Sequence, residues 1–133
     1  MALKVLIVED ELIVAEDLKS MLLSYGYDNS GIAYNYTEAI NLLDSSEVDI
    51  ALLDINLGGN KTGVDVAKYI RETFQIPVVF ISSNSDPISV KATVEVKPNG
   101  YLVKPFRKED IFTAIETALV NCTSEERLSK SEV

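Results

Sequence analysis

Runs of branched apolar residues recur along the chain, each short enough to be one buried strand. Residues 3–8 and 49–54 are almost continuous in Val, Ile and Leu, a pattern typical of strands buried on both faces of a parallel sheet. A weaker run covers residues 30–34. We therefore expect five strands, at residues 3–8, 30–34, 49–54, 77–82 and 100–103.

Segments with helical periodicity separate these strands. Residues 12–25 repeat apolar side chains every three or four positions, and Gly26 follows as a residue that suits a helix end. Asn35 and Glu38 resemble a capping box at the start of a second helix, and residues 63–74 carry a third apolar face. Two more helices are expected, one starting at Asp86-Pro87 and one carrying Ile111, Ile115, Ala118 and Leu119.

Strand and helix thus alternate five times, which predicts an α/β fold with helices on both faces of a parallel sheet. Five strands and five helices fit an open, doubly wound, flavodoxin-like sheet in the order 2-1-3-4-5, and not an eight-stranded barrel. The apolar pattern ends after residue 121. We therefore expect one domain over residues 1–121 and a polar tail or the start of a linker over residues 122–133.

Composition narrows the classes of function. The 133 residues include 12 Lys and Arg against 21 Asp and Glu, a net charge of −9 that disfavours direct contact with nucleic acid or an acidic membrane surface. No apolar run approaches the roughly 18 residues of a membrane span. The single Cys122 and the lack of a signal-peptide pattern favour the cytoplasm. The chain has no His, so its chemistry must use carboxylates, hydroxyls and lysines.

Polar residues stand at four of the expected strand ends: Glu9 and Asp10 after the first, Asp54 at the third, Ser82 at the fourth and Lys104 at the fifth. The carboxyl ends of parallel strands share one edge of the sheet, where ligands bind, so these side chains should converge. Carboxylates about 4 Å apart repel by roughly 4 kcal/mol at an effective dielectric of 20, so the cluster calls for a cation. Oxygen ligands without His or Cys favour Mg²⁺ over zinc.

Each of these polar residues can also be explained without a binding site. Glu11, next to the pair, suits the start of a helix through the helix dipole. Asp54 and Ser82 could be ordinary turn residues, and Lys104 a solvated side chain. These separate explanations give no reason why acids, a hydroxyl and a lysine all fall at strand ends.

Four motifs resemble the receiver domain of two-component response regulators. They are Glu9-Asp10 after KVLIV, LLDINL around Asp54, PVVFISS around Ser82, and GYLVKPF ending at Phe106. Their order and spacing fit the family, and the resemblance covers residues 3–120. It implies that Asp54 accepts a phosphoryl group from a sensor histidine kinase or a phosphotransfer protein, with Lys104 pairing to the phosphoryl oxygens. It implies a Mg²⁺ site made by Glu9, Asp10, Asp54 and the backbone carbonyl of Asn56.

The resemblance also implies a conformational switch. Ser82 would supply the switch hydroxyl, Tyr101 the aromatic ring that moves inward behind it, and Lys104-Pro105 a bond that is cis in the family's fold. The family often dimerises through the face of its fourth helix, fifth strand and fifth helix, which makes a homodimer an option here.

Three alternative functions fit this sequence less well. A phosphohydrolase of the haloacid dehalogenase type would want a second acid at position 56, where this chain has Asn56. A flavin carrier would need a Gly-rich or hydroxyl-rich loop after the first strand, but this loop is acidic. A degenerate receiver that binds partners without phosphorylation is disfavoured by the intact set of Asp10, Asp54, Ser82 and Lys104. We therefore expect a switch that catalyses its own phosphorylation and dephosphorylation and has no metabolic substrate.

Overall fold

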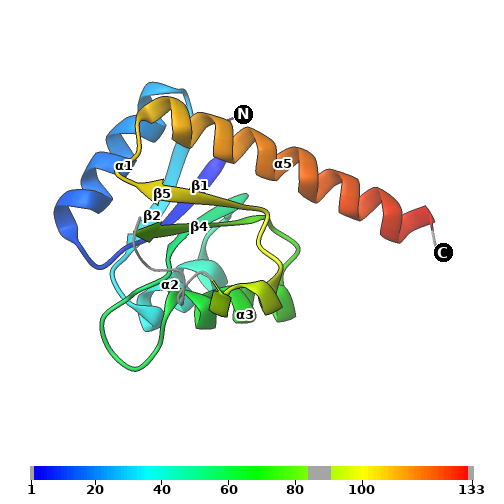
Figure 1. The fold of residues 1–133 in the computed structure, drawn as a ribbon, viewed down its shortest axis with the longest axis horizontal. Helices are drawn as coiled ribbons and strands as arrows, with labels where there is room; N and C mark the ends of the chain where they lie inside the picture. The colour runs from blue at the N-terminus through cyan, green and yellow to red at the C-terminus, as the bar shows by residue number, and fades with distance from the viewer. Residues whose placement is uncertain (1, 84–90, 132–133) are drawn as a thin grey trace.

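The computed structural model describes residues 2–83 and 91–131. Its strands are β1 (Lys4–Val8), β2 (Asp28–Ala33), β3 (Ile50–Asp54), β4 (Val78–Ser83) and β5 (Gly100–Lys104). They form one parallel sheet in the order β2-β1-β3-β4-β5 (Figure 1), which confirms the predicted order. The order reverses between β1 and β3, so the sheet is doubly wound around that point.

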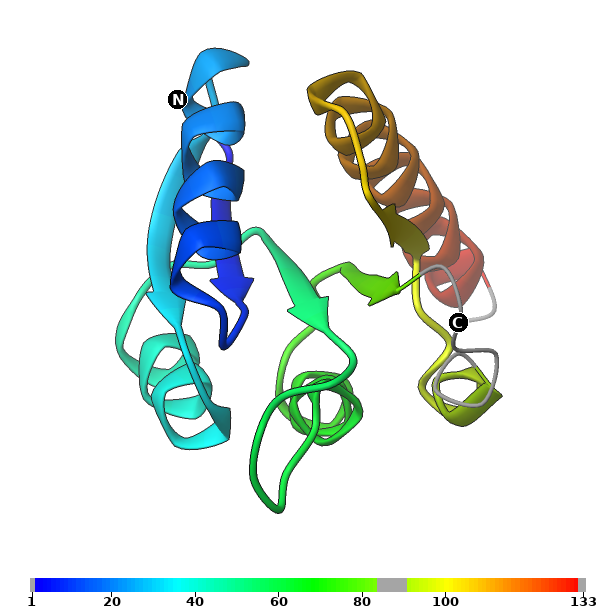
Figure 2. The same ribbon diagram turned by 60° about the vertical axis from the view of Figure 1, so that its left-hand side comes forward.

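Helices cover both faces of the sheet (Figure 2). On one face lie α1 (Leu12–Ser24) and α5 (Lys108–Ser131), and on the other lie α2 (Tyr36–Ser45) and α3 (Gly63–Thr73). Each face buries its own apolar cluster. Val5 and Ile7 of β1 belong to the cluster under α1 and α5, whereas Leu6 and Val8 belong to the cluster under α2 and α3. Burial on both faces explains why this strand is an unbroken apolar run in the sequence.

Side-chain caps fix where two of the helices begin. Asn35 precedes α2, and its side chain accepts a hydrogen bond of 2.9 Å from the Glu38 backbone N–H, as the pattern predicted. Glu38 reaches one residue further back than in a regular capping box, since its Oε1 accepts from the Tyr34 N–H. A complete capping box, formed by Thr62 and Asp65, precedes α3. This second cap ties the start of α3 to the loop that follows β3.

The predicted fourth helix begins at Asp86-Pro87, outside the described residues. Residues 91 and 92 are helical, and the 3₁₀ turn η1 (Val94–Val96) follows. The described residues therefore hold four α-helices and one 3₁₀ turn.

Helix α5 is longer than the apolar pattern suggested. It continues past residue 121 to Ser131, so residues 122–131 are helical, and the domain boundary expected at residue 121 stays a prediction. Figure 1 shows this end of α5 extending beyond the sheet. Its length does not make it a membrane helix, because no helix in residues 2–83 or 91–131 is both long and apolar enough to span a bilayer.

Candidate functional site

Charged residues gather at the carboxyl edge of the sheet. Glu9 and Asp10 directly follow β1, while Asp54 and Lys104 are the last residues of β3 and β5. Each of the three carboxylates offers an oxygen within 4.8 Å of the other two. We call Glu9, Asp10 and Asp54 the acidic cluster. The convergence expected from the strand ends is therefore present in the fold.

Lys104 supplies positive charge to the acidic cluster. Its Nζ lies 3.0 Å from Glu9 Oε1 and 3.4 Å from Asp54 Oδ2. The two carboxylates are removed from solvent, since Glu9 is 0% and Asp54 is 5% exposed, whereas Asp10 is exposed. One ammonium group faces three carboxyl groups, so the cluster as a whole lacks positive charge.

This lack of positive charge alters the proton affinity of the buried groups. The pKa of Glu9 is raised to about 8, first by burial and then by the adjacent Asp54 carboxyl, against the lowering effect of Lys104. For Lys104, burial lowers the pKa, but the bond to Glu9 and the charge of Asp54 outweigh burial and raise it overall. Without a metal ion, burial and the adjacent Asp54 carboxyl therefore favour the protonated form of Glu9.

The loop between β3 and α3 orients two of the carboxylates through its backbone. The Asn56 N–H donates a hydrogen bond of 3.0 Å to Asp54 Oδ1, and the Gly58 N–H donates one of 3.1 Å to Asp10 Oδ2. Both contacts leave other carboxylate oxygens for a ligand. The assignment of the Asn56 carbonyl as a metal ligand stays a prediction.

Glu11 stands at the start of α1, as expected, and also lies near Lys104. It occupies the N-cap position of α1, but its side chain makes no capping hydrogen bond. Its Oε1 lies 4.0 Å from Lys104 Nζ, and its backbone N–H donates to Glu9 Oε2 at 3.3 Å. The Lys104 ammonium is therefore its electrostatic partner.

The other predicted site residues are Ser82 on β4, Tyr101 on β5 and Pro105 directly after β5. Ser82 is 3% exposed and follows Ile81, the residue of β4 that pairs with Asp54. Tyr101 lies on β5 and is 40% exposed. The Lys104-Pro105 peptide bond is cis. Ser82 is thus a near neighbour of Asp54 in the sheet, while the ring of Tyr101 is at the surface.

Comparison with known proteins agrees with this geometry. Residues 5–116 match the family of the response regulator receiver domain. The chain belongs to this family.

Solved structures of receiver domains superpose on most of this one. It is 35% identical to the signal receiver domain of a modulated diguanylate cyclase from Desulfovibrio desulfuricans, with a TM-score of 0.86 over 94% of this chain and 99% of that chain. It is 31% identical to the N-terminal domain of a response regulator/sensory box/GGDEF three-domain protein from Carboxydothermus hydrogenoformans, with a TM-score of 0.83 and coverage of 92% and 98%. A Vibrio cholerae chemotaxis protein shares the fold at 23% identity, with a TM-score of 0.81 and coverage of 89% and 99%.

One residue that holds the site of this receiver domain together was not singled out from the sequence. Gly63, the first residue of α3, lies so close to β3 that an added Cβ would be 2.0 Å from the Asp54 backbone oxygen. Its N–H donates to the Ile55 carbonyl at 3.1 Å. The available signal was a glycine directly after a Thr that caps a helix, close in sequence to Asp54.

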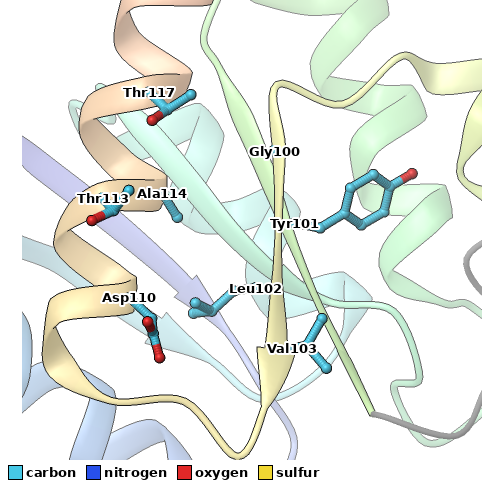
Figure 3. Close-up of a pocket in the computed structure, with 8 residues that line it drawn as sticks. All are labelled: Gly100, Tyr101, Leu102, Val103, Asp110, Thr113, Ala114 and Thr117. Atoms are coloured by element: carbon cyan, nitrogen blue, oxygen red, sulfur yellow. The ribbon is translucent and has the colours of Figure 1, made fainter.

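A groove of about 480 Å³ lies between β5 and α5 of the receiver domain (Figure 3). Residues 100–103 line one side, and Asp110, Thr113, Ala114 and Thr117 line the other. Figure 3 shows the Tyr101 ring pointing away from α5, while Leu102 points towards it. No member of the acidic cluster lines this groove, so the two features are separate.

Proposed function

We propose that this receiver domain accepts a phosphoryl group on Asp54 from the phosphohistidine of a sensor histidine kinase or a phosphotransfer protein. One observation carries the proposal: a nearly buried Asp54 carboxylate lies in the acidic cluster with Lys104 Nζ 3.4 Å away. A carboxylate in this setting combines a nucleophile with a fixed cation at the place where phosphoryl charge develops. Membership of the receiver family supports the same chemistry.

The proposed transfer is a single displacement at phosphorus. An Asp54 side-chain oxygen forms a bond to phosphorus as the bond from phosphorus to the imidazole nitrogen breaks, and the imidazole leaves with that electron pair. The Lys104 ammonium stabilises the charge on the phosphoryl oxygens. Later attack by water on phosphorus releases inorganic phosphate and restores the Asp54 carboxylate.

The acidic cluster fits Mg²⁺. Its donors are oxygens only, which suits a hard divalent ion. Glu9 Oε1 is buried and, although Lys104 Nζ lies 3.0 Å away, has no hydrogen bond of normal geometry among the described residues. Glu9, Asp10, Asp54 and the Asn56 carbonyl would hold the ion. When bound, Mg²⁺ would supply the additional positive charge that the carboxylates require when a phosphoryl group enters the site.

Phosphorylation would act on Ser82 and Tyr101. A phosphoryl group on Asp54 adds acceptor oxygens beside the strand that carries Ser82, whose hydroxyl then donates to one of them. Tyr101 moves inward behind it. The outer surface around β5 changes with this motion, since Tyr101 and Val103 are 40% and 47% exposed there. That surface is the proposed contact for an output domain, a partner or a second copy.

Incubation with acetyl phosphate and Mg²⁺ is expected to add one phosphoryl group to the wild-type protein, detected by intact mass. Asp54→Asn is expected to abolish the adduct, because the amide is not a nucleophile towards phosphorus. Chelation of Mg²⁺ by EDTA is expected to abolish it as well. Asp17→Asn removes an exposed acid on α1 and is the matched control, with labelling equal to wild type.

Two outcomes would contradict the proposal. Labelling that persists in Asp54→Asn would place the acceptor elsewhere. Absence of an adduct on folded wild-type protein would favour a receiver that binds partners without phosphorylation.

The free energy of unfolding of the metal-free protein is expected to fall as the pH rises from about 5 to about 8. The pKa of Glu9 is about 8 in the folded protein, against about 4.3 for Glu in an unfolded chain. The folded state therefore binds more protons in this window, and the associated stability is lost as the pH rises through the folded pKa. Urea unfolding in EDTA across this pH range measures the slope.

Glu9→Gln is the control for this pH effect, because it keeps the side chain's size and cannot titrate. Its stability should depend less on pH than that of the wild type. Added Mg²⁺ should stabilise the wild type more at pH 8 than at pH 6, since the ion competes with the Glu9 proton. Equal slopes for wild type and Glu9→Gln would show that Glu9 titrates normally.

A further inference from the structure

The hydroxyl of Tyr101 has a specific partner outside the acidic cluster. Tyr101 Oη and Thr93 Oγ1 form a hydrogen bond that joins β5 to the residue just before η1. Thr93 is 0% exposed, whereas Tyr101 is 40% exposed. The bond thus ties a surface ring to a fully buried side chain.

The Tyr101 ring lies on the same sheet face as the proposed switch hydroxyl. Tyr101 pairs with Phe80 in the sheet, and the two ring centroids are 6.2 Å apart. Ser82 follows Phe80 by two residues on β4, so both side chains stand on that face. Among residues 2–83 and 91–131, the Thr93 hydroxyl and the Phe80 ring both contact the ring in its surface position.

We propose that Thr93 is a positioning residue that holds Tyr101 in its outward position before phosphorylation. The link to phosphorylation rests on the proposed function, but the outward position concerns the unphosphorylated protein alone. When the ring leaves this position, the hydrogen bond between Tyr101 Oη and Thr93 Oγ1 is lost, and its free energy favours the outward ring. The bond therefore shifts the equilibrium of the ring towards the surface.

The expected size of this shift is about fivefold in the ratio of outward to inward rings, the factor that corresponds to one ordinary hydrogen bond. A ligand that requires the inward ring binds with its intrinsic affinity multiplied by the fraction of protein that has the ring inward, so a larger outward population weakens binding. Thr93 thereby raises the free energy that a phosphoryl group on Asp54 must supply in order to bring the Tyr101 ring inward.

The test uses ¹⁹F NMR of the full chain labelled with 3-fluorotyrosine, with Tyr101→Phe to assign the Tyr101 signal. The difference in its chemical shift between H₂O and D₂O reports how exposed the ring is. Thr93→Val keeps the shape of the side chain and removes the hydroxyl, so in unphosphorylated protein this difference should decrease. Thr93→Ser keeps the hydroxyl and should restore the wild-type value, which a purely structural role of the Thr93 methyl would not explain. Equal values in Thr93→Val, Thr93→Ser and wild type would overturn the proposal.

A second arm separates this proposal from the proposed function. Beryllofluoride with Mg²⁺, a mimic of the phosphoryl group, should bury the wild-type Tyr101 ring and should bind Thr93→Val up to about fivefold more tightly. If beryllofluoride leaves the wild-type signal unchanged, the proposed switch fails, while the comparison of unphosphorylated variants still decides the role of Thr93. If the wild type responds and Thr93→Val binds the probe no more tightly, Thr93 does not set the equilibrium.

Discussion

Gly63→Ala is expected to destabilise the protein by about 3 kcal/mol or more, because the new methyl group has no space. Its Cβ would lie 2.0 Å from the Asp54 carbonyl oxygen, 2.9 Å from the Asp54 carbonyl carbon and 3.2 Å from Ile55 Cα. All three are backbone atoms at the end of a central strand, so no side-chain rotation relieves the clash. The first turn of α3 or the end of β3 must move instead.

Displacement of β3 also moves the proposed phosphoacceptor. The Asp54 carbonyl that the methyl would contact belongs to the same residue as the carboxylate 3.4 Å from Lys104. Any Gly63→Ala protein that folds should therefore label slowly with acetyl phosphate. Urea unfolding measures the loss of stability, and intact mass measures the labelling rate.

Gly100→Ala is the matched control for this effect. A Cβ at Gly100 would meet only ordinary contacts, at 3.8 Å from Val79 Cγ2 and 3.9 Å from the Ala114 oxygen. We expect a change within about 1 kcal/mol, with some gain from the reduced freedom of the unfolded chain. Similar stabilities for Gly63→Ala and Gly100→Ala would show that α3 can move away from β3 at little cost.

Arg71→Ala is expected to cost about 3 kcal/mol, because it removes a guanidinium that donates to four acceptors within the described part of the chain. Nε donates to the Val96 carbonyl at 2.9 Å, and Nη1 donates to the Ile76 carbonyl at 3.1 Å. Nη2 donates at 2.8 Å both to the Lys97 carbonyl and to Asn99 Oδ1. These contacts join α3 to the chain before β4 and to the segment between η1 and β5.

Loss of the guanidinium also affects a buried amide. Asn99 is 6% exposed, and its Oδ1 accepts from the Val78 N–H at 2.9 Å as well as from Arg71. Arg71→Lys should recover only part of the stability, since an ammonium cannot reproduce the planar array of donors. Chemical denaturation of the three proteins measures the series.

Arg107→Ala is the surface control for the Arg71 series. Arg107 is 79% exposed and pairs with Asp110 at 3.6 Å, three residues along the chain. Exposed pairs of this kind contribute about 0.5 kcal/mol or less. If Arg71→Ala were as mild as Arg107→Ala, water would replace the four bonds without loss.

The sheet and the acidic cluster could be predicted because both depend on repeated local patterns. The apolar run of β1 reports burial on two faces, and the alternation of strand with helix fixes a parallel sheet. Once the sheet is parallel, Glu9, Asp54 and Lys104 must share an edge. The length of α5 was not predictable in this way, since apolar periodicity reports packing against the sheet, and a helix can continue after its packed face ends.

The residues that support the site could not be found from such patterns. Arg71 has the sequence context of a solvated residue on the polar side of a helix, and the acceptors on Val96, Lys97 and Asn99 lie beyond β4, far from it in sequence. Gly63 matters because of a distance between two backbones, which no sequence pattern encodes. The sequence placed Glu11 at the start of α1, where it lies, but could not show that its carboxylate is also 4.0 Å from Lys104 at the end of β5.

The extended form of α5 has a mechanical consequence. A helix of 24 residues is about 36 Å long, and its first turns pack on the sheet through Ile111 and Ile115. A tilt of about 5° about those turns displaces the far end, roughly 24 Å beyond Ile115, by about 2 Å. A small change in packing beside β5 would thereby be amplified into a displacement of about 2 Å at the end of α5.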